Sequence, residues 1–381
     1  MTQMTMTFDA VDEAAPGPKW AARWSRSWPA YEAWFIARGG DAGPSRTECR
    51  AALHRHMPEL VPTYDRLVEL AGGSDRAARF LSGWCPPAYL GGCSIAAVAD
   101  GSDVRLVRNY DLSPDLNEGL LLRTEWTGRA VMGMVEFLWG LSDGINDAGL
   151  AVALAYGGRQ KVGEGFGIAT ILRYVLETCD TVDQALAALR RIPSHMAYNL
   201  VLADADGNTA SVEVAPGGGI TVMPQPIATN HQGATAVAVR PDFTRTRKRH
   251  AHLAALRVPA RKLNRHFLRK PLLQDRYRAG FGTLFTAEYD PQARALGLTI
   301  TGQRWDQTLA AFHEGQRHVD YSRNERLTGA SNAQPAPCHD VDWSQAGRID
   351  WRRVAADYAS GRGQAIHAYL PSRQPSCRSA A

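Results

Sequence analysis

The order of expected elements between residues 93 and 315 constrains the fold more than any other feature of this chain. Strand-like runs come first, two helical stretches follow in tandem, and strand-like runs then return. The expected strands are 94–99, 104–109, 120–125, 130–138, 150–156, 199–204, 209–214, 220–223, 283–289 and 296–300, with a turn at 142–144. Periodicity alone predicts an α+β protein, and this order is typical of two antiparallel sheets packed face to face under helices.

The two tandem helices are expected at 166–178 and 181–191, and Thr181 with Gln184 forms a capping-box pattern at the start of the second. Residues 1–92 read mostly helical, with helices expected at 30–38, 47–56, 58–70 and 74–81. Residues 93–315 are the expected catalytic core. Residues 316–381 form a C-terminal extension, with a helix expected at 349–359 and a disordered end at 371–381.

Cys93 opens the first expected strand, directly after Gly92. A turn at 100–103 leads into the second strand, which delivers Arg108 and Asp111. A hairpin of this length brings both side chains back beside the cysteine. A thiol, a cation and a carboxylate at one strand end are the parts of an activated nucleophile. Taken singly, however, such a cysteine is more often a small buried hydrophobe, and such an arginine and aspartate are more often a local ion pair.

Four short stretches occur in the order found in a known family. They are Gly91–Ser94, Val107–Asp111, Ala228–His231 and Gly282–Asp290. Together they make the chain resemble the acyl-coenzyme A:6-aminopenicillanic acid acyltransferase group, peptidase family C45, of the N-terminal-nucleophile hydrolases. The resemblance extends from Gly91 to about residue 312. It implies a four-layer αββα sandwich preceded by a helical N-terminal segment.

The resemblance also implies a zymogen that cuts itself between Gly92 and Cys93, so that residues 1–92 become a small subunit. Cys93 would then supply a thiol nucleophile and an α-amino base, whose reference pKa values are about 8.5 and about 7.7–8.0. Arg108 would stabilise the thiolate, and Asp111 would orient the new amino group. Asn230, which alone is more often a turn residue, would donate to the oxyanion hole.

A further arginine is implied shortly before the 282–290 stretch. Arg276 and Arg278 both lie near that place, and we name Arg278 as the candidate. Residues 240–278 contain 13 Lys or Arg against two Asp, whereas the whole chain is only +5. A solvated helix at 244–256 is the simpler interpretation of this basic run. Its functional interpretation is attraction of an acidic substrate or of the phosphates of an acyl-CoA. Nucleic-acid binding is not expected, because no reader motif accompanies the run.

Cofactor, metal and membrane classes find no support in the sequence. No apolar run approaches the ~18 residues of a membrane helix, and residues 1–18 lack the basic and apolar regions of a signal peptide. Six scattered cysteines without a CxxC spacing predict neither a disulfide framework nor a zinc site. We therefore expect a cytoplasmic enzyme without cofactor or metal, whose partners are a small-molecule amide or acyl donor and its own N-terminal fragment.

Three functions remain open at this point. The first is hydrolysis of a linear amide through an acyl-Cys93 intermediate. The second is acyl-CoA-dependent N-acyl transfer in natural-product metabolism, which passes through the same intermediate and differs in the second nucleophile. The third is an uncleaved, inactive homologue that only binds, against which the intact Gly92, Cys93, Arg108, Asp111 and Asn230 speak.

Overall fold

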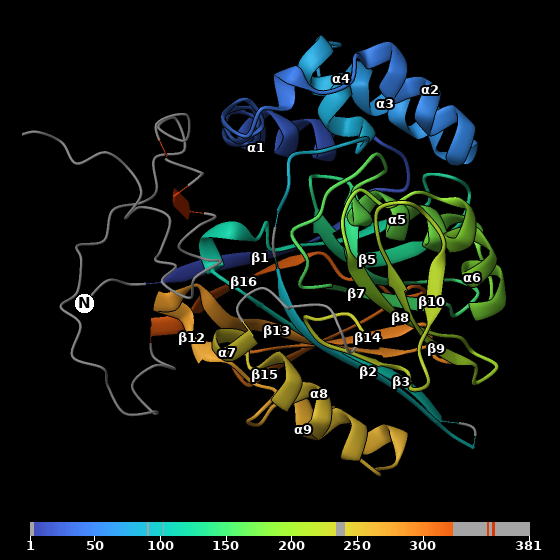
Figure 1. Cartoon of the computed structure of the whole chain (residues 1–381), viewed down its shortest axis with the longest axis vertical. Helices are drawn as coiled ribbons and strands as arrows, with labels where there is room; N and C mark the ends of the chain where they lie inside the picture. The colour runs from blue at the N-terminus through green and yellow to red at the C-terminus, as the bar shows by residue number, and fades with distance from the viewer. Residues whose placement is uncertain are drawn as a thin grey trace, which may run out of the picture.

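The computed structural model describes residues 4–89, 91–101, 103–233 and 241–322, together with Ile349, Arg353 and Val354. Two sheets lie face to face at the centre, and helices cover the outer face of each (Figure 1). Among the strands that the structure describes, pairing is antiparallel except where β1 runs parallel to β4. The predicted α+β class and the four-layer αββα sandwich are therefore confirmed.

The larger sheet has nine strands among the described residues, in the order β10-β9-β8-β7-β6-β5-β4-β1-β16. These strands are β1 (Thr5–Asp12), β4 (Leu120–Thr124), β5 (Val131–Glu136), β6 (Gly140–Asn146), β7 (Ala151–Tyr156), β8 (Tyr198–Ala203), β9 (Thr209–Val214), β10 (Ile220–Val222) and β16 (Gly315–Asp320). The central strands β6, β7 and β8 are buried along their whole length. Burial on both faces is what a sheet between two other layers requires.

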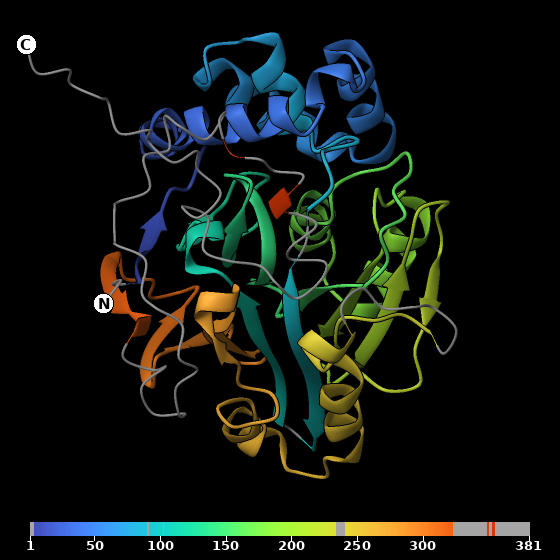
Figure 2. The ribbon, with the colours of Figure 1, turned by 60° about the vertical axis from the view of Figure 1, so that its left-hand side comes forward.

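The smaller sheet follows the order β11-β2-β3-β13-β14-β15, with β12 paired to β13. Its strands are β2 (Gly92–Asp100), β3 (Asp103–Leu112), β11 (Ile227–Ala228), β12 (Asp275–Arg276), β13 (Phe281–Asp290), β14 (Ala295–Ile300) and β15 (Gln303–Thr308). β2 and β3 form the hairpin expected from the sequence, and they run side by side through the middle of Figure 2.

Side-chain caps fix several helix starts. The helices are α1 (Pro18–Ala37), α2 (Arg46–His56), α3 (Val61–Leu70), α4 (Asp75–Ser82), α5 (Ile168–Thr178), α6 (Val182–Arg191), α7 (Pro241–Thr244), α8 (Thr246–Ala255) and α9 (Asn264–Phe267). Ser45 and Glu48 form a full capping box on α2, so that helix begins before the expected position 47. Thr181 caps α6 by accepting from Gln184 N, as predicted.

Three apolar clusters hold the layers together. The first joins α1–α4, α5 and α6 to the outer face of the nine-stranded sheet. The second fills the space between the two sheets and includes Cys93. The third packs α8, α9 and the short helix η4 (Ala260–Lys262) under the outer face of β2 and β3. The predicted nucleophile thus lies in the layer between the sheets.

Several local predictions were wrong. The prediction of mostly helical residues 1–92 missed the strand β1, which inserts between β4 and β16 in the nine-stranded sheet. The expected helix at 30–38 is the end of α1, which starts at Pro18 and tolerates Pro29 in its interior. The expected turn at 142–144 is the middle of β6. β1 and β16 come from outside the expected 93–315 core in sequence, yet they lie side by side at one edge of the nine-stranded sheet. The boundaries at 92 and 315 stay predictions.

The helix expected at 349–359 and the disordered end expected at 371–381 lie outside the described residues, apart from Ile349, Arg353 and Val354. Within the described part of the chain, no helix combines the length and apolar character needed to cross a membrane. The four cysteines that the structure describes are free thiols at positions 49, 85, 93 and 179.

Candidate active site

The β2–β3 hairpin positions three of the predicted residues. In its register Gly92 lies opposite Asp111, and Cys93 lies opposite Tyr110. Residues directly opposite in an antiparallel pair project to the same face, so Cys93 and Tyr110 share the inter-sheet layer. The chain descends from the N-terminal helices and enters β2 from the side of the nine-stranded sheet (Figures 1 and 2).

Cys93 is buried and interacts directly with Arg108. The exposed fraction of Cys93 is 1%, and its Sγ accepts a hydrogen bond from Arg108 Nη2 at 3.1 Å. Burial raises the pKa of the Cys93 thiol to about 11, which outweighs the lowering effect of the Arg108 charge. In the intact chain the cysteine is therefore a neutral thiol at neutral pH.

Arg108 is held by an acidic partner that the sequence analysis missed. Arg108 Nη1 donates to Asp143 Oδ2 at 2.8 Å and to Ser142 Oγ at 2.9 Å, and both charged groups are fully buried. Tyr289 donates a further hydrogen bond to Asp143 Oδ1 at 3.0 Å. Burial lowers the pKa of Arg108, but Cys93 and Asp143 raise it further, so the guanidinium stays charged beside the thiol. The Arg108 guanidinium also lies 4.3 Å from the centre of the Tyr110 ring.

Asp111 has one satisfied oxygen and one open one. Thr283 Oγ1 donates to Asp111 Oδ1 at 2.7 Å. Asp111 Oδ2 is buried and accepts no hydrogen bond from the residues that the structure describes, and Arg249 Nη1 lies 3.8 Å away. Burial raises the pKa of Asp111, against the lowering effect of Arg249 and Thr283. A cationic donor placed near Gly92 would complete this carboxylate.

Asn230 lies just after β11 and reaches the backbone of the predicted nucleophile. Its Oδ1 accepts from Cys93 N at 3.0 Å and from Arg249 Nη2 at 2.7 Å. Its Nδ2 donates to Tyr156 O at 3.2 Å and approaches Gly91 O at 3.5 Å. Asn199 Nδ2 donates to the carbonyls on either side of Asn230, which fixes that loop. The structure thus brings Cys93, Arg108, Asp111 and Asn230 together.

Arg249 is the second residue that the sequence analysis missed. It lies in the basic run predicted to form a solvated helix face, yet it is completely buried. Its Nη1 donates to Cys93 O and, at 2.7 Å, to Ser94 Oγ. Thr246, Arg249 and Leu253 are the buried positions of α8, and their helical spacing was the available signal. The neighbouring residues 247 and 248 are exposed, as a solvated helix face requires.

Arg276 and Arg278, the two arginines considered for the further role, differ in their burial. Arg278 lies in the short helix η5 (Tyr277–Ala279), and its side chain is exposed. Arg276 is half-buried, with its guanidinium 5.3 Å from the centre of the Phe281 ring. Burial lowers the pKa of Arg276, and the opposing effects include that of Asp111. The positive charge of Arg276 therefore acts to lower the pKa of Asp111.

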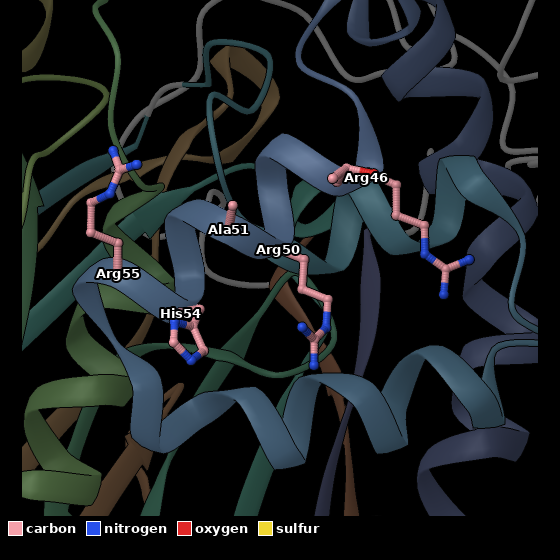
Figure 3. Close-up of a pocket in the computed structure, with 6 residues that line it drawn as sticks. Arg46, Arg50, Ala51, His54 and Arg55 are labelled. Carbon is pink, nitrogen blue, oxygen red and sulfur yellow. The ribbon is translucent and has the colours of Figure 1, made fainter.

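A cavity of about 440 Å³ adjoins the site on the side of Tyr110. Its walls come from α1, the segment before β2, β3 and the end of β5, and they include Trp34, Tyr110 and Glu136. A second hollow of about 710 Å³ lies on the exposed surface of α2. Figure 3 shows Arg46, Arg50, His54 and Arg55 projecting from that helix. It is lined by α2 alone and by none of the residues around Cys93, so we assign the chemistry to the first cavity.

Comparisons with known proteins identify the family of the chain and leave the site residues untested. The family model described as acyl-coenzyme A:6-aminopenicillanic acid acyl-transferase matches residues 98–305. A search of curated protein sequences found no similar protein.

Solved structures with a similar course of the chain are also known. A mutant conjugated bile acid hydrolase from Clostridium perfringens is 13% identical, with a TM-score of 0.39, and the match covers 59% of this chain and 96% of that one. Penicillin V acylase from Agrobacterium tumefaciens is 17% identical, with a TM-score of 0.39 and coverage of 62% and 89%. The N-acylethanolamine-hydrolyzing acid amidase orthologue of Caenorhabditis elegans is 18% identical, with a TM-score of 0.39 and coverage of 52% and 93%.

Similarities as low as these carry no argument about function. The family model, in contrast, covers more than half of the 381 residues and includes Arg108, Asp111, Asn230 and Arg249. The chain therefore belongs to the acyl-coenzyme A:6-aminopenicillanic acid acyl-transferase family.

Proposed function

We propose that this protein is a self-activating cysteine enzyme that hydrolyses linear amides through an acyl-Cys93 intermediate. One observation carries the proposal. The buried Cys93 directly follows a glycine, its sulfur accepts a hydrogen bond from a charged arginine, and its backbone nitrogen donates to Asn230. The two atoms that such an enzyme uses are thus already held in place. They are the Cys93 sulfur, which attacks, and the Cys93 nitrogen, which becomes the α-amino base.

Self-cleavage would begin with attack of Cys93 Sγ on the carbonyl carbon of Gly92. The thiol proton passes to the backbone nitrogen of Cys93 as the C–N bond breaks, which leaves a thioester between residues 92 and 93. The same step leaves Cys93 with a new α-amino group, and water then hydrolyses the thioester to a Gly92 carboxylate and a free thiol. Arg108 favours the developing thiolate, and Asn230 Oδ1 fixes the nitrogen that becomes the leaving group.

The new α-amino group would then meet the open oxygen of Asp111. That oxygen is buried and accepts no hydrogen bond from the described residues of the intact chain, and Asp111 lies opposite Gly92 in the strand register. An ammonium group there gains a charge-assisted hydrogen bond. In its neutral form the amine accepts the thiol proton as Cys93 attacks the substrate carbonyl, and it later passes the proton to the departing amine.

The oxyanion of the substrate would be stabilised by Asn230. Its Nδ2 points towards the carbonyls of Tyr156 and Gly91 in the intact chain, and release of the 91–92 segment frees one of these contacts. Arg249 positions Asn230 by donating to its Oδ1, which turns Nδ2 towards the same place. A preorganised donor of this kind acts strongly because water is excluded.

The N-terminal fragment would remain bound as a small subunit. Helices α1–α4 share one apolar cluster with the nine-stranded sheet, and β1 lies inside that sheet. Cleavage at residue 92 breaks a single peptide bond and leaves this core intact, so the two fragments should separate only on denaturation.

The free thiols at positions 49, 85, 93 and 179 support action in the reducing cytoplasm.

Acyl transfer from a CoA thioester is the second candidate, because the family model carries that description. The exposed Arg247 and Lys248 on α8 would attract the CoA phosphates. We favour hydrolysis, since water is always available, whereas transfer needs a second pocket for the amine.

The test is incubation of the purified enzyme with N-acyl amino acids, acyl-CoA thioesters and millimolar amines, followed by quantification of products. Hydrolysis predicts mainly free acid. More amide than acid, with CoA thioesters as the best donors, would favour transfer. In that case reversing the charges of Arg247 and Lys248 should raise KM for the thioester in a salt-dependent way.

A further inference from the structure

Two residues of the stretch Ala228–His231 have no part in the mechanism above, and these are Thr229 and His231. They follow β11, and their side chains meet that of Thr246, the first residue of α8. Both threonines are buried, and His231 is half-buried. We call Thr229, His231 and Thr246 the threonine–histidine cluster.

The cluster is closed by hydrogen bonds among its own members. His231 Nδ1 lies 2.9 Å from Thr246 Oγ1 and 3.2 Å from Thr229 Oγ1. Thr246 Oγ1 donates to Thr229 Oγ1 at 2.9 Å, and Thr229 Oγ1 donates to the carbonyl of Thr246 at 3.2 Å. Each hydroxyl has a single proton, and these two bonds use both protons. The contact between His231 and Thr246 therefore requires a proton on Nδ1, which His231 donates.

His231 makes this donation as a neutral ring. Burial lowers the pKa of His231 to about 4, and His250, Arg247 and Arg249 act in the same direction. The His250 ring packs against the His231 ring at 5.1 Å between centroids. A neutral imidazole has one N–H, so the cluster selects the form in which Nδ1 carries it.

The cluster joins two segments that the course of the chain does not hold together. His231 and Thr246 are 15 positions apart in sequence, and a connection of that length leaves many relative positions open. Asn230 lies between the two members of the first segment. Arg249 lies three residues after Thr246, about one turn further along α8. A shift of one segment against the other would therefore separate Asn230 from Arg249.

Asn230 and Arg249 meet at Cys93, so their relative position matters for the chemistry. Arg249 Nη2 donates to Asn230 Oδ1 at 2.7 Å, and the same oxygen accepts from Cys93 N at 3.0 Å. Arg249 Nη1 also donates to the Cys93 carbonyl. Misplacement of such groups by about 1 Å can cost on the order of 100-fold in rate.

Other anchors hold this loop to a different layer. Asn199 donates to the carbonyls of Thr229 and His231 at 2.8 and 2.9 Å, and Asn199 belongs to β8 of the nine-stranded sheet. Gln232 Nε2 donates at 3.0 Å to the carbonyl of Tyr198 in the same strand. α8 instead lies on the outer face of the smaller sheet (Figure 1). The threonine–histidine cluster thus ties the loop to the start of α8.

We propose that His231 is a positioning residue, which keeps Asn230 and Arg249 together at Cys93 by donating its Nδ1–H to Thr246. The inference rests on the proposed amide hydrolysis and deepens it, because His231 itself touches no reacting atom. Loss of the imidazole should lower kcat, since Asn230 acts on the oxyanion, and should leave KM nearly unchanged.

The test compares His231→Asn with His231→Leu in hydrolysis of the N-acyl amino acid that the wild type cleaves fastest, with the released amino acid measured by chromatography. The first substitution places an amide N–H where Nδ1 was, so kcat should stay within roughly threefold of wild type. The second removes the donor, so kcat should fall roughly 10- to 100-fold. Equal kcat for the two variants would overturn the proposal, as would a loss that appears only in KM.

His250→Leu is the matched control, because His250 packs against the same ring and no hydrogen bond from it to Thr229 or Thr246 is described. It should keep the wild-type kcat, and a loss as large as that of His231→Leu would contradict the proposal. Thr246→Val removes the accepting hydroxyl. The double variant His231→Leu/Thr246→Val should lose no more than the worse single variant, because both changes remove the same bond. Losses that multiply would refute the shared bond.

Hydrogen exchange separates failure of this proposal from failure of amide hydrolysis. The backbone N–H at position 93 donates to Asn230 Oδ1, so its exchange rate reports whether Asn230 is held in place. In Cys93→Ala protein, His231→Leu should speed exchange at this position roughly 10-fold by NMR and leave the other amides of the β2–β3 ladder unchanged. This result supports the positioning role even if the protein hydrolyses no amide. Unchanged exchange there, or equal acceleration along the whole ladder, refutes it.

Discussion

Replacement of Gly92 by alanine is the perturbation whose effect follows most directly from the geometry. An added methyl group would lie 2.4 Å from Phe281 Cε2 and 2.7 Å from the carbonyl oxygen of Asp111. The second contact is with backbone inside the β2–β3 ladder, so it cannot be relieved by a side-chain rotation. Relief of the strain therefore requires a shift of the backbone at Gly92, which carries the scissile carbonyl.

The size of the effect can be estimated from overpacking. Inserting a methyl group into a packed site costs about 1–3 kcal/mol. If that cost appears in the barrier to attack, self-cleavage slows by roughly 5- to 150-fold, since 1.36 kcal/mol is a factor of ten. Gly91→Ala is the matched control, because a methyl group at Gly91 has no atom within 4 Å.

The assay is a time course of chain cleavage by intact-mass spectrometry after rapid purification. Gly92→Ala should accumulate full-length protein, and Gly91→Ala should be processed at the wild-type rate. Cleavage of Gly92→Ala as fast as wild type would refute the claim that the packing of this glycine aligns the scissile carbonyl. Equal slowing of both variants would refute it as well.

Three further predictions follow from the same contacts. Asn230→Ala should lower kcat on the order of 100- to 1000-fold with little change in KM, and near-normal turnover would remove Asn230 from the oxyanion hole. In the uncleaved Cys93→Ala background, Asp143→Asn should lower the free energy of unfolding by about 3–5 kcal/mol in urea titrations, because it strips the counter-charge from buried Arg108. Tyr289→Phe, which removes only one hydrogen bond to Asp143, should lose about 1 kcal/mol, and an equal loss in both variants would contradict the ion-pair account. Burial raises the pKa of Cys93 to about 11, so the thiolate fraction grows with pH throughout the range below that value. Cleavage of the slowly processed Gly92→Ala protein should therefore accelerate from pH 6 to pH 9. A rate that does not change with pH would contradict a protonated resting thiol.

The parts of the site that the sequence predicted are those encoded locally. Turn residues between two strand-like runs specify the β2–β3 hairpin, and the hairpin places Cys93, Arg108 and Asp111 without reference to the rest of the chain. Asn230 is different, because it comes from 137 residues further along, and only the resemblance to a family pointed to it.

The parts that were missed depend on tertiary packing. The Ser142–Gly144 segment has the composition of a turn, yet β6 lies between β5 and β7, and Asp143 there is paired with a charge 35 residues away in sequence. Arg249 was missed because residues 240–278 were interpreted from their positive charge alone. Its spacing from Thr246 and Leu253 places it on the same, buried face of α8. β1 and β16 pair across the whole chain, a contact that no local pattern encodes.

The intact mass of the purified wild-type protein under denaturing conditions tests the central claim most directly. Self-activation predicts two chains, residues 1–92 and 93–381, the second beginning with Cys93 and Ser94, and a single full-length chain for Cys93→Ala. An enzyme that is fully active as one uncut chain of 381 residues would contradict the account.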